Sequence, residues 1–178
     1  MIVALAGRRV DAAGAMPPRF PLANADVVGD RVRQLFDARG VRTLVCSAAC
    51  GADLIALRVA RELGLRRVVV LPFPPAEFRA RSVTDRPGDW GSLFDDVVAD
   101  ARAAGTLVVL HEPGADDAAR HAYERTNAAI VERALAEGAA VLGVAVWDRA
   151  SRGAGDMTEH FVHVAGARGL AVEHVSTL

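Results

Sequence analysis

Lysine is absent from the chain, and its absence excludes several kinds of chemistry. All 21 basic residues among its 178 positions are arginines. A Walker A phosphate-binding loop requires a lysine, and so do enzymes that form a Schiff base, including those that use pyridoxal phosphate. Anions bound by this chain must therefore be held by arginine side chains, backbone N–H groups or helix N-termini.

Cysteine and aromatic residues are also scarce. The two cysteines, Cys46 and Cys50, are too few for a secreted disulfide scaffold, and no matching Cys or His pair completes a zinc site. No apolar run approaches the ~20 residues that cross a bilayer, and the N-terminus lacks the leading charge of a signal peptide. We therefore expect a cytoplasmic protein with no metal ion, no cofactor and no membrane partner.

The composition is that of one globular domain over residues 1–178. Hydrophobic residues make up 52% of the chain and charged residues 24%, and the length suits a single domain. Short runs that are apolar on both faces alternate with amphipathic stretches, as in a parallel sheet covered by helices on both sides. The six runs are Ile2–Ala6, Thr43–Cys46, Val68–Phe73, Thr106–Leu110, Ala140–Trp147 and Leu170–Val175.

Apolar residues at helical spacing occur in each of the five intervals between these runs. Each of these stretches is followed by a glycine, where helices commonly end. The alternation predicts an α/β fold of Rossmann-like, doubly wound type, with a mostly parallel six-stranded sheet and helices on both faces. The default strand order for such a fold is 3-2-1-4-5-6. The glycines are Gly40, Gly64, Gly105, Gly138 and Gly169.

Ligands of an open parallel sheet bind beyond the carboxyl ends of its strands, so the residues that follow each run are candidate contacts. The segment Ser47–Asp53, with the sequence SAACGAD, joins a predicted strand to a helix through small residues. Small residues let backbone N–H groups approach a ligand. The alternative is an ordinary tight turn in which Asp53 caps the helix that follows. Pro72 and Phe73 begin a proline-rich segment, Pro72–Asp89, which is expected to be a loop that is either functional or mobile.

Three further positions have both a functional and a structural interpretation. Tyr123 and Asn127 lie four residues apart in a predicted helix, so they share a face that can contact a ligand or simply pack. Trp147 ends a strand, and its ring can either stack on a base or pack at the edge of the hydrophobic core. Glu112 and Asp53 are weak candidates for acid–base catalysis, and Glu112 can equally be part of a loop. Asp53 is expected to stay ionised because a helix N-terminus favours negative charge.

Several segments together resemble the SLOG superfamily, which groups DprA, the Lonely Guy phosphoribohydrolases and many sensors of nucleotide ligands. They are a G-x-R element at Gly7–Arg9, an S-x-x-x-G-[AI]-D turn at Ser47–Asp53, an L-P-F-P element at Leu71–Pro74, a V-W-D segment at Val146–Asp148 and a helix start at Gly153–Thr158. The resemblance covers nearly the whole chain and implies a Rossmann-like domain that binds nucleotides or nucleotide-derived ligands. The implied contacts are Gly7, Arg9, Ser47, Gly51, Asp53, Trp147, Asp148, Gly155 and Thr158, joined at the strand ends by Ala52, Pro72 and Phe73.

The chain departs from that family pattern in its second half. An arginine follows Trp147 and Asp148 where the family has a glycine, and Asp156 stands at a helix start where it would repel a phosphate. The phosphoribohydrolase signature P-G-G-x-G-T-x-x-E is absent, together with its catalytic glutamate. Arg8 and Arg9 follow the first strand, where side chains alternate direction, so only one of the two is expected to face the ligand. The resemblance selects Arg9 as the residue that contacts the anion.

These observations leave three functions open. The first is a sensor or signalling domain that binds a nucleotide or a nucleotide derivative, with a homodimer as an expected assembly. The alternative is a hydrolase of the N-glycosidic bond of nucleoside monophosphates, for which a carboxylate must activate water or stabilise positive charge. The third is a binder of single-stranded DNA, which a net charge of -1 and an aromatic content of 5% disfavour.

Overall fold

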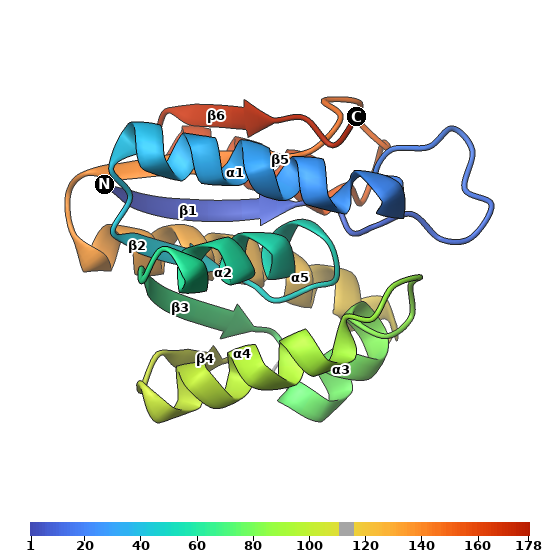
Figure 1. Ribbon diagram of the computed structural model, residues 1–178, viewed down its shortest axis with the longest axis horizontal. Coiled ribbons are helices and arrows are strands. Elements are labelled where there is room, and N and C mark those ends of the chain that lie inside the picture. Colours follow the sequence, from blue (N-terminus) through green and yellow to red (C-terminus); the bar gives the residue numbers. More distant parts are fainter. Residues whose placement is uncertain (111–115) are drawn as a thin grey trace.

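The computed structural model describes the backbone of residues 1–110 and 116–178, and the side chains of residues 1–110 and 120–178. The described residues form an all-parallel, six-stranded sheet between two layers of helices (Figure 1). The α/β, Rossmann-like, doubly wound fold expected from the sequence is confirmed. The strands are β1 (Ile2–Gly7), β2 (Thr43–Cys46), β3 (Arg66–Leu71), β4 (Leu107–Val109), β5 (Val141–Val146) and β6 (Val172–Val175).

The helices divide between the two faces of the sheet. The helices that precede β4 cover one face, and α5 and α6 cover the other, so each face has its own apolar core. Within the described residues, no helix is both long enough and apolar enough to span a membrane. The helices are η1 (Leu22–Asn24, a 3-10 turn), α1 (Ala25–Arg39), α2 (Ala52–Glu62), α3 (Pro75–Ser82), α4 (Gly91–Ala103), α5 (Asp116–Glu137) and α6 (Met157–Ala167).

Residues of β1 alternate between the two cores, as the period of a strand requires. Val3 and Leu5 belong to the core under α1, α2 and α4. Ala4 and Ala6 belong to the core under α5 and α6. Because both faces of β1 are covered, the strand is apolar at nearly every position, and this is why the sequence predicted a buried parallel strand.

The order of the strands differs from the default. The sheet runs β4-β3-β2-β1-β5-β6, so the prediction 3-2-1-4-5-6 is wrong. The chain adds β4 beside β3 before α5 returns over the opposite face, and β5 rather than β4 pairs with β1. Strands that are apolar on both faces carry no local signal for their neighbours, so pairing could not be predicted from the runs. As a result, the connections that leave β1 and β5 run in opposite directions.

The segment Pro72–Asp89 is not the continuous loop that was expected, because it contains α3. Pro75 occupies the first turn of this helix, where a proline is compatible with helical geometry. The ring of Phe78 is buried against that of Phe94 in α4, with 6.0 Å between the ring centroids. Prolines that signalled a loop therefore mark the start of a short helix beside the carboxyl ends of the strands.

Candidate functional site

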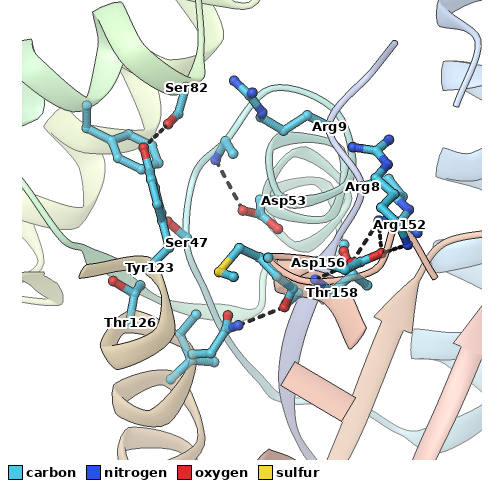
Figure 2. Close-up of a pocket in the computed structure, with 18 residues that line it drawn as sticks. Arg8, Arg9, Ser47, Asp53, Ser82, Tyr123, Thr126, Arg152, Asp156 and Thr158 are labelled. Carbon is cyan, nitrogen blue, oxygen red and sulfur yellow. Dashed lines mark hydrogen bonds and ion pairs between the residues drawn. The ribbon is translucent and has the colours of Figure 1, made fainter. Parts of the chain in front are cut away.

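A cavity of about 260 Å³ lies at the carboxyl ends of β1 and β2, beside the point where the connections from β1 and β5 diverge (Figure 2). Ligands of open α/β sheets bind at such a point. The walls come from the segments that follow β1, β2 and β5 and from the helices α3 and α5. Eight of the predicted contacts line this cavity: Gly7, Arg9, Ser47, Asp53, Tyr123, Asn127, Gly155 and Thr158.

The other predicted contacts lie outside the cavity lining. Phe73 is fully buried and packs edge-on against Tyr123, with 5.7 Å between ring centroids. The indole N–H of Trp147 donates to Nδ1 of His174 at 2.9 Å, so this ring belongs to the edge of the core. Glu112 lies outside the described residues. The cavity lining also leaves out Gly51, Ala52, Pro72 and Asp148.

Gly7 and Gly51 bring the segments of the site together through close backbone approach. A Cβ on Gly7 would lie 2.4 Å from the Cβ of Ala52 and 2.6 Å from the carbonyl oxygen of Val146. Gly51 has a φ of +100°, and a Cβ there would lie 2.7 Å from the backbone nitrogen of Val10. Both positions therefore need glycine to pack β1 against α2 and β5.

Arg8 also lines the cavity, so the expectation that only one of the two arginines faces it is wrong. The strand β1 ends at Gly7, and the alternation of a strand no longer governs the residues that follow. The Arg8 guanidinium is buried and donates from Nη1 to both carboxyl oxygens of Asp156, at 2.8 and 2.7 Å, and from Nε to Asp148 at 3.1 Å. Arg19 completes the cluster by donating to the second oxygen of Asp148 at 2.8 Å.

This cluster keeps both aspartates charged. Burial is the largest single influence and by itself would raise the pKa of Asp148 and Asp156. The hydrogen bonds and the charge of Arg8, together with the other donors to each carboxylate, outweigh it and hold both pKa values below the usual range. Asp156 also caps α6 by accepting from the backbone N–H groups of Thr158 and Glu159. The N-terminus of α6 is thus occupied by the protein's own carboxylate, which leaves little there for a phosphate.

Two arginines at the cavity have guanidinium N–H groups without a partner among the described residues. Nη1 of Arg9 donates to Asp85 at 2.9 and 2.7 Å and to the carbonyl of Arg81 at 3.2 Å, while its Nε and Nη2 make no hydrogen bond with any described residue. Arg152 is exposed, and in the part of the chain that the structure describes its guanidinium has no hydrogen bond or ion pair. Partial burial, followed by repulsion from Arg8, lowers the pKa of Arg152. An anion bound beside it would relieve that repulsion.

Asp53 is the cavity residue whose environment differs most from expectation. Its side chain is buried, its Oδ2 accepts from the backbone N–H of Ala49 at 3.2 Å, and α2 has no side-chain cap, so Asp53 does not cap the helix. Among the described residues, its Oδ1 is the single buried side-chain nitrogen or oxygen that has no hydrogen-bond partner. Burial raises the pKa of Asp53 to about 7, and the Ala49 hydrogen bond offsets only part of this rise. The prediction that Asp53 stays ionised is wrong for neutral pH, because the loss of solvation raises its pKa more than the helix N-terminus lowers it.

The helices α3 and α5 form the wall of the cavity opposite α2, and they contribute both polar and apolar side chains to it. The hydroxyl oxygens of Ser82 and Tyr123 are hydrogen-bonded at 2.8 Å (Figure 2). The side-chain amide of Asn127 donates to the carbonyl of Met157 at 2.8 Å. Tyr123 and Asn127 thus face the same cavity, as their spacing predicted, while Ile130 adds an apolar surface one turn further along.

Sequence patterns gave no signal for Arg152 or Ser82 as site residues. Arg152 lies in an irregular segment after β5, and Ser82 ends a helix that was expected to be a loop. Arg8 was visible, but its acidic partners lie 140 and 148 positions away in the chain. In the described part of the chain, no group of three or more His, Cys, Asp or Glu side chains is placed to hold a metal ion.

Comparison with known proteins does not assign this site. No protein-family model matches the chain, and no curated protein matches it. The resemblance to the SLOG superfamily therefore stays a prediction that rests on the motifs themselves.

Proposed function

We propose that the chain binds a nucleotide or nucleotide-derived ligand in this cavity, as a sensor or signalling module of the kind that the SLOG resemblance implies. One observation carries the proposal: a cavity at the diverging strand ends is lined by Arg9 and Arg152, and both guanidinium groups keep N–H groups without an acceptor among the described residues. Guanidinium groups bind phosphate oxygens in a planar, charge-assisted geometry. In a chain without lysine, these groups are the natural phosphate anchors.

The size of the cavity supports a ligand of mononucleotide size. Its volume of about 260 Å³ lies just below the ~300–1,000 Å³ of pockets that bury drug-sized ligands. A dinucleotide would need a longer groove, and no dinucleotide motif follows any strand. Apolar surface from Ile130 and Met157 beside the hydroxyls of Ser47 and Tyr123 suits a ligand with one flat apolar part and one polar part.

Calorimetric titration with AMP, GMP, CMP, UMP and inorganic phosphate tests the proposal. At least one nucleotide is expected to bind, and Arg152→Ala to weaken it by roughly ten- to a hundredfold, the range for a hydrogen bond to a charged group. Arg102→Ala is the matched control, because Arg102 is exposed on α4 and does not line the cavity. Failure of all four nucleotides to bind would contradict the proposal.

The environment of Asp53 favours a second candidate, hydrolysis of the N-glycosidic bond of a nucleoside monophosphate. A general base works best when its pKa lies near the operating pH, and burial brings the pKa of Asp53 to about 7. Release of free base from the four nucleotides, followed by chromatography, tests this activity. Turnover that Asp53→Asn abolishes would support the hydrolase, whereas tight binding without base release would leave the sensor function alone.

A further inference from the structure

One oxygen of Asp53 needs a hydrogen-bond donor. The residue is 6% exposed and lines the cavity, and its Oδ1 is without a partner while its Oδ2 accepts from the backbone of Ala49. Buried polar atoms are nearly always hydrogen-bonded, because an unpaired buried atom loses its hydrogen bonds to water and gains none in the protein. Figure 2 shows Asp53 near the middle of the site, with Tyr123 and Ser82 to one side. A ligand in the cavity can supply the missing donor.

Asp53 lies on the same wall as Arg9. The backbone N–H of Ala52 donates to the carbonyl of Arg8 at 3.1 Å, and Gly51 pairs with Arg9 in an isolated antiparallel bridge. The first turn of α2 is therefore fastened directly beside the segment that carries Arg9. An acceptor on Asp53 and a phosphate anchor on Arg9 would consequently contact neighbouring parts of one ligand.

The order of groups in a nucleotide matches this arrangement. The sugar follows the phosphate, so a phosphate on Arg9 brings the sugar to the wall that holds Asp53. The apolar side chains of Ile130 and Met157 come from α5 and the start of α6, and they are left for the base. A nucleotide bound in this way would bring its sugar hydroxyls, which are hydrogen-bond donors, toward the unpaired oxygen of Asp53.

We infer that Oδ1 of Asp53 accepts a hydrogen bond from the 2′- or 3′-hydroxyl of a ribose, so that the cavity selects ribonucleotides over their deoxy counterparts. The inference rests on the proposed function. A deoxy position offers no donor, and a deoxynucleotide would leave the buried oxygen unpaired. Sites built to bond a hydroxyl reject analogues that lack it for this reason.

The test is calorimetric titration of the full chain with AMP, GMP, CMP and UMP and with the 2′-deoxy and 3′-deoxy form of each. For the nucleotides that bind, loss of one of the two hydroxyls is expected to weaken binding by roughly ten- to a hundredfold. In Asp53→Asn the amide oxygen stays on the Ala49 N–H, and the NH₂ group, which cannot accept a hydrogen bond, replaces Oδ1. Ribo and deoxy forms should then bind this variant within about twofold of each other, because the acceptor is gone.

Asp26→Asn is the matched control, because Asp26 lies in the first turn of α1 with its side chain 96% exposed. This variant should keep the ribose preference. Equal binding of ribo and deoxy forms by the wild-type chain overturns the inference and leaves the proposed function standing. A ribose preference that survives in Asp53→Asn overturns the inference as well. If that variant also loses the release of free base, the carboxyl group of Asp53 acts as the general base that activates water. Absence of binding by every nucleotide contradicts the proposed function and this inference together.

Discussion

Asp53 and Asp156 are buried to the same extent, 6% exposed each, and both line the cavity at the start of a helix that follows a strand. Their pKa values nevertheless shift in opposite directions. Arg8 bonds both oxygens of Asp156 and keeps that carboxylate charged, whereas Asp53 has one backbone donor and a pKa of about 7. Burial raises the pKa of a carboxyl group, and the number of hydrogen-bonding and charged partners decides whether that rise is offset. The aspartates on the side built by β5 and α6 are satisfied by the protein's own donors, whereas Asp53 on the side built by α2 keeps one oxygen without a donor among the described residues.

The two sides should respond to pH with opposite signs. The folded pKa of Asp156 lies below its unfolded value, so its stabilising contribution is present at neutral pH and is lost as the pH falls through the folded pKa. The folded pKa of Asp53 lies above its unfolded value of about 3.8, so its contribution is fully present below that value and is lost as the pH rises through about 7. A substitution on each side therefore tests the comparison.

Removal of Arg8 is expected to have the largest effect. Arg8→Ala leaves the carboxylates of Asp148 and Asp156 buried without their main partner, and loss of one member of a buried pair costs about 3–5 kcal/mol. Urea denaturation at pH 7 measures the loss in the free energy of unfolding. A decrease of less than about 1 kcal/mol in the free energy of unfolding, which is typical of an exposed ion pair, would contradict the expectation that this cluster strongly stabilises the fold.

Asp53→Asn is expected to stabilise the fold at high pH. The ordinary pKa of 3.8 and the value of about 7 in the fold differ by about 3, which corresponds to on the order of 4 kcal/mol for an ionised Asp53. The gain over wild type should therefore be largest at pH 8 and should vanish near pH 4, as measured by urea denaturation at both pH values. The matched control Asp26→Asn, at a side chain that is 96% exposed, should change the free energy of unfolding by less than about 0.5 kcal/mol. Equal stability of wild type and Asp53→Asn at pH 8 would show that Asp53 is satisfied in the fold.

Gly51→Ala probes how the Asp53 side is fastened to the segment after β1. The new Cβ would meet the backbone nitrogen of Val10 at 2.7 Å and the carbonyl oxygen of Arg8 at 2.9 Å, at a φ of +100°. We expect a loss of about 1–3 kcal/mol in thermal or urea denaturation. Gly14→Ala is the control, since it also has a positive φ of +73° but no atom within 4 Å of its Cβ. Similar losses in both variants would show that backbone conformation alone, and not close packing, matters at Gly51.

Arg9→Ala should have the smallest effect on stability and a clear effect on binding. Arg9 pairs with Asp85 where the two side chains are 31% and 32% exposed, and exposed pairs contribute about 0–1 kcal/mol. Affinity for the bound nucleotide should fall roughly ten- to a hundredfold, because the free N–H groups of Arg9 are lost. Calorimetry and denaturation on the same sample separate the two readouts. A stability loss as large as that of Arg8→Ala, with binding unchanged, would reverse the roles assigned to the two arginines.

Much of the fold was predictable because its signals are local. A strand covered on both faces must be apolar at nearly every position, as β1 is, and a helix must repeat its apolar residues at its own period, as α5 does at Ile130, Val131 and Ala134. The same period correctly placed Tyr123 and Asn127 on one face of the cavity. The periodicity of a helix or strand depends on residues that are close together in the chain, so it can be predicted directly from the sequence.

The fold class, the six strands, five of the helices with their glycine ends, and the segments that meet at the carboxyl ends of the sheet could all be predicted from the sequence, whereas the helix α3 was missed. Contacts between distant segments set the strand order, the joining of Arg8 to Asp148 and Asp156, and the presence of Arg152 and Ser82 at the cavity. They also decided the charge of Asp53. A helix or strand forms from interactions between near neighbours, whereas an ion pair and a shifted pKa depend on which distant side chains arrive and how much water they displace.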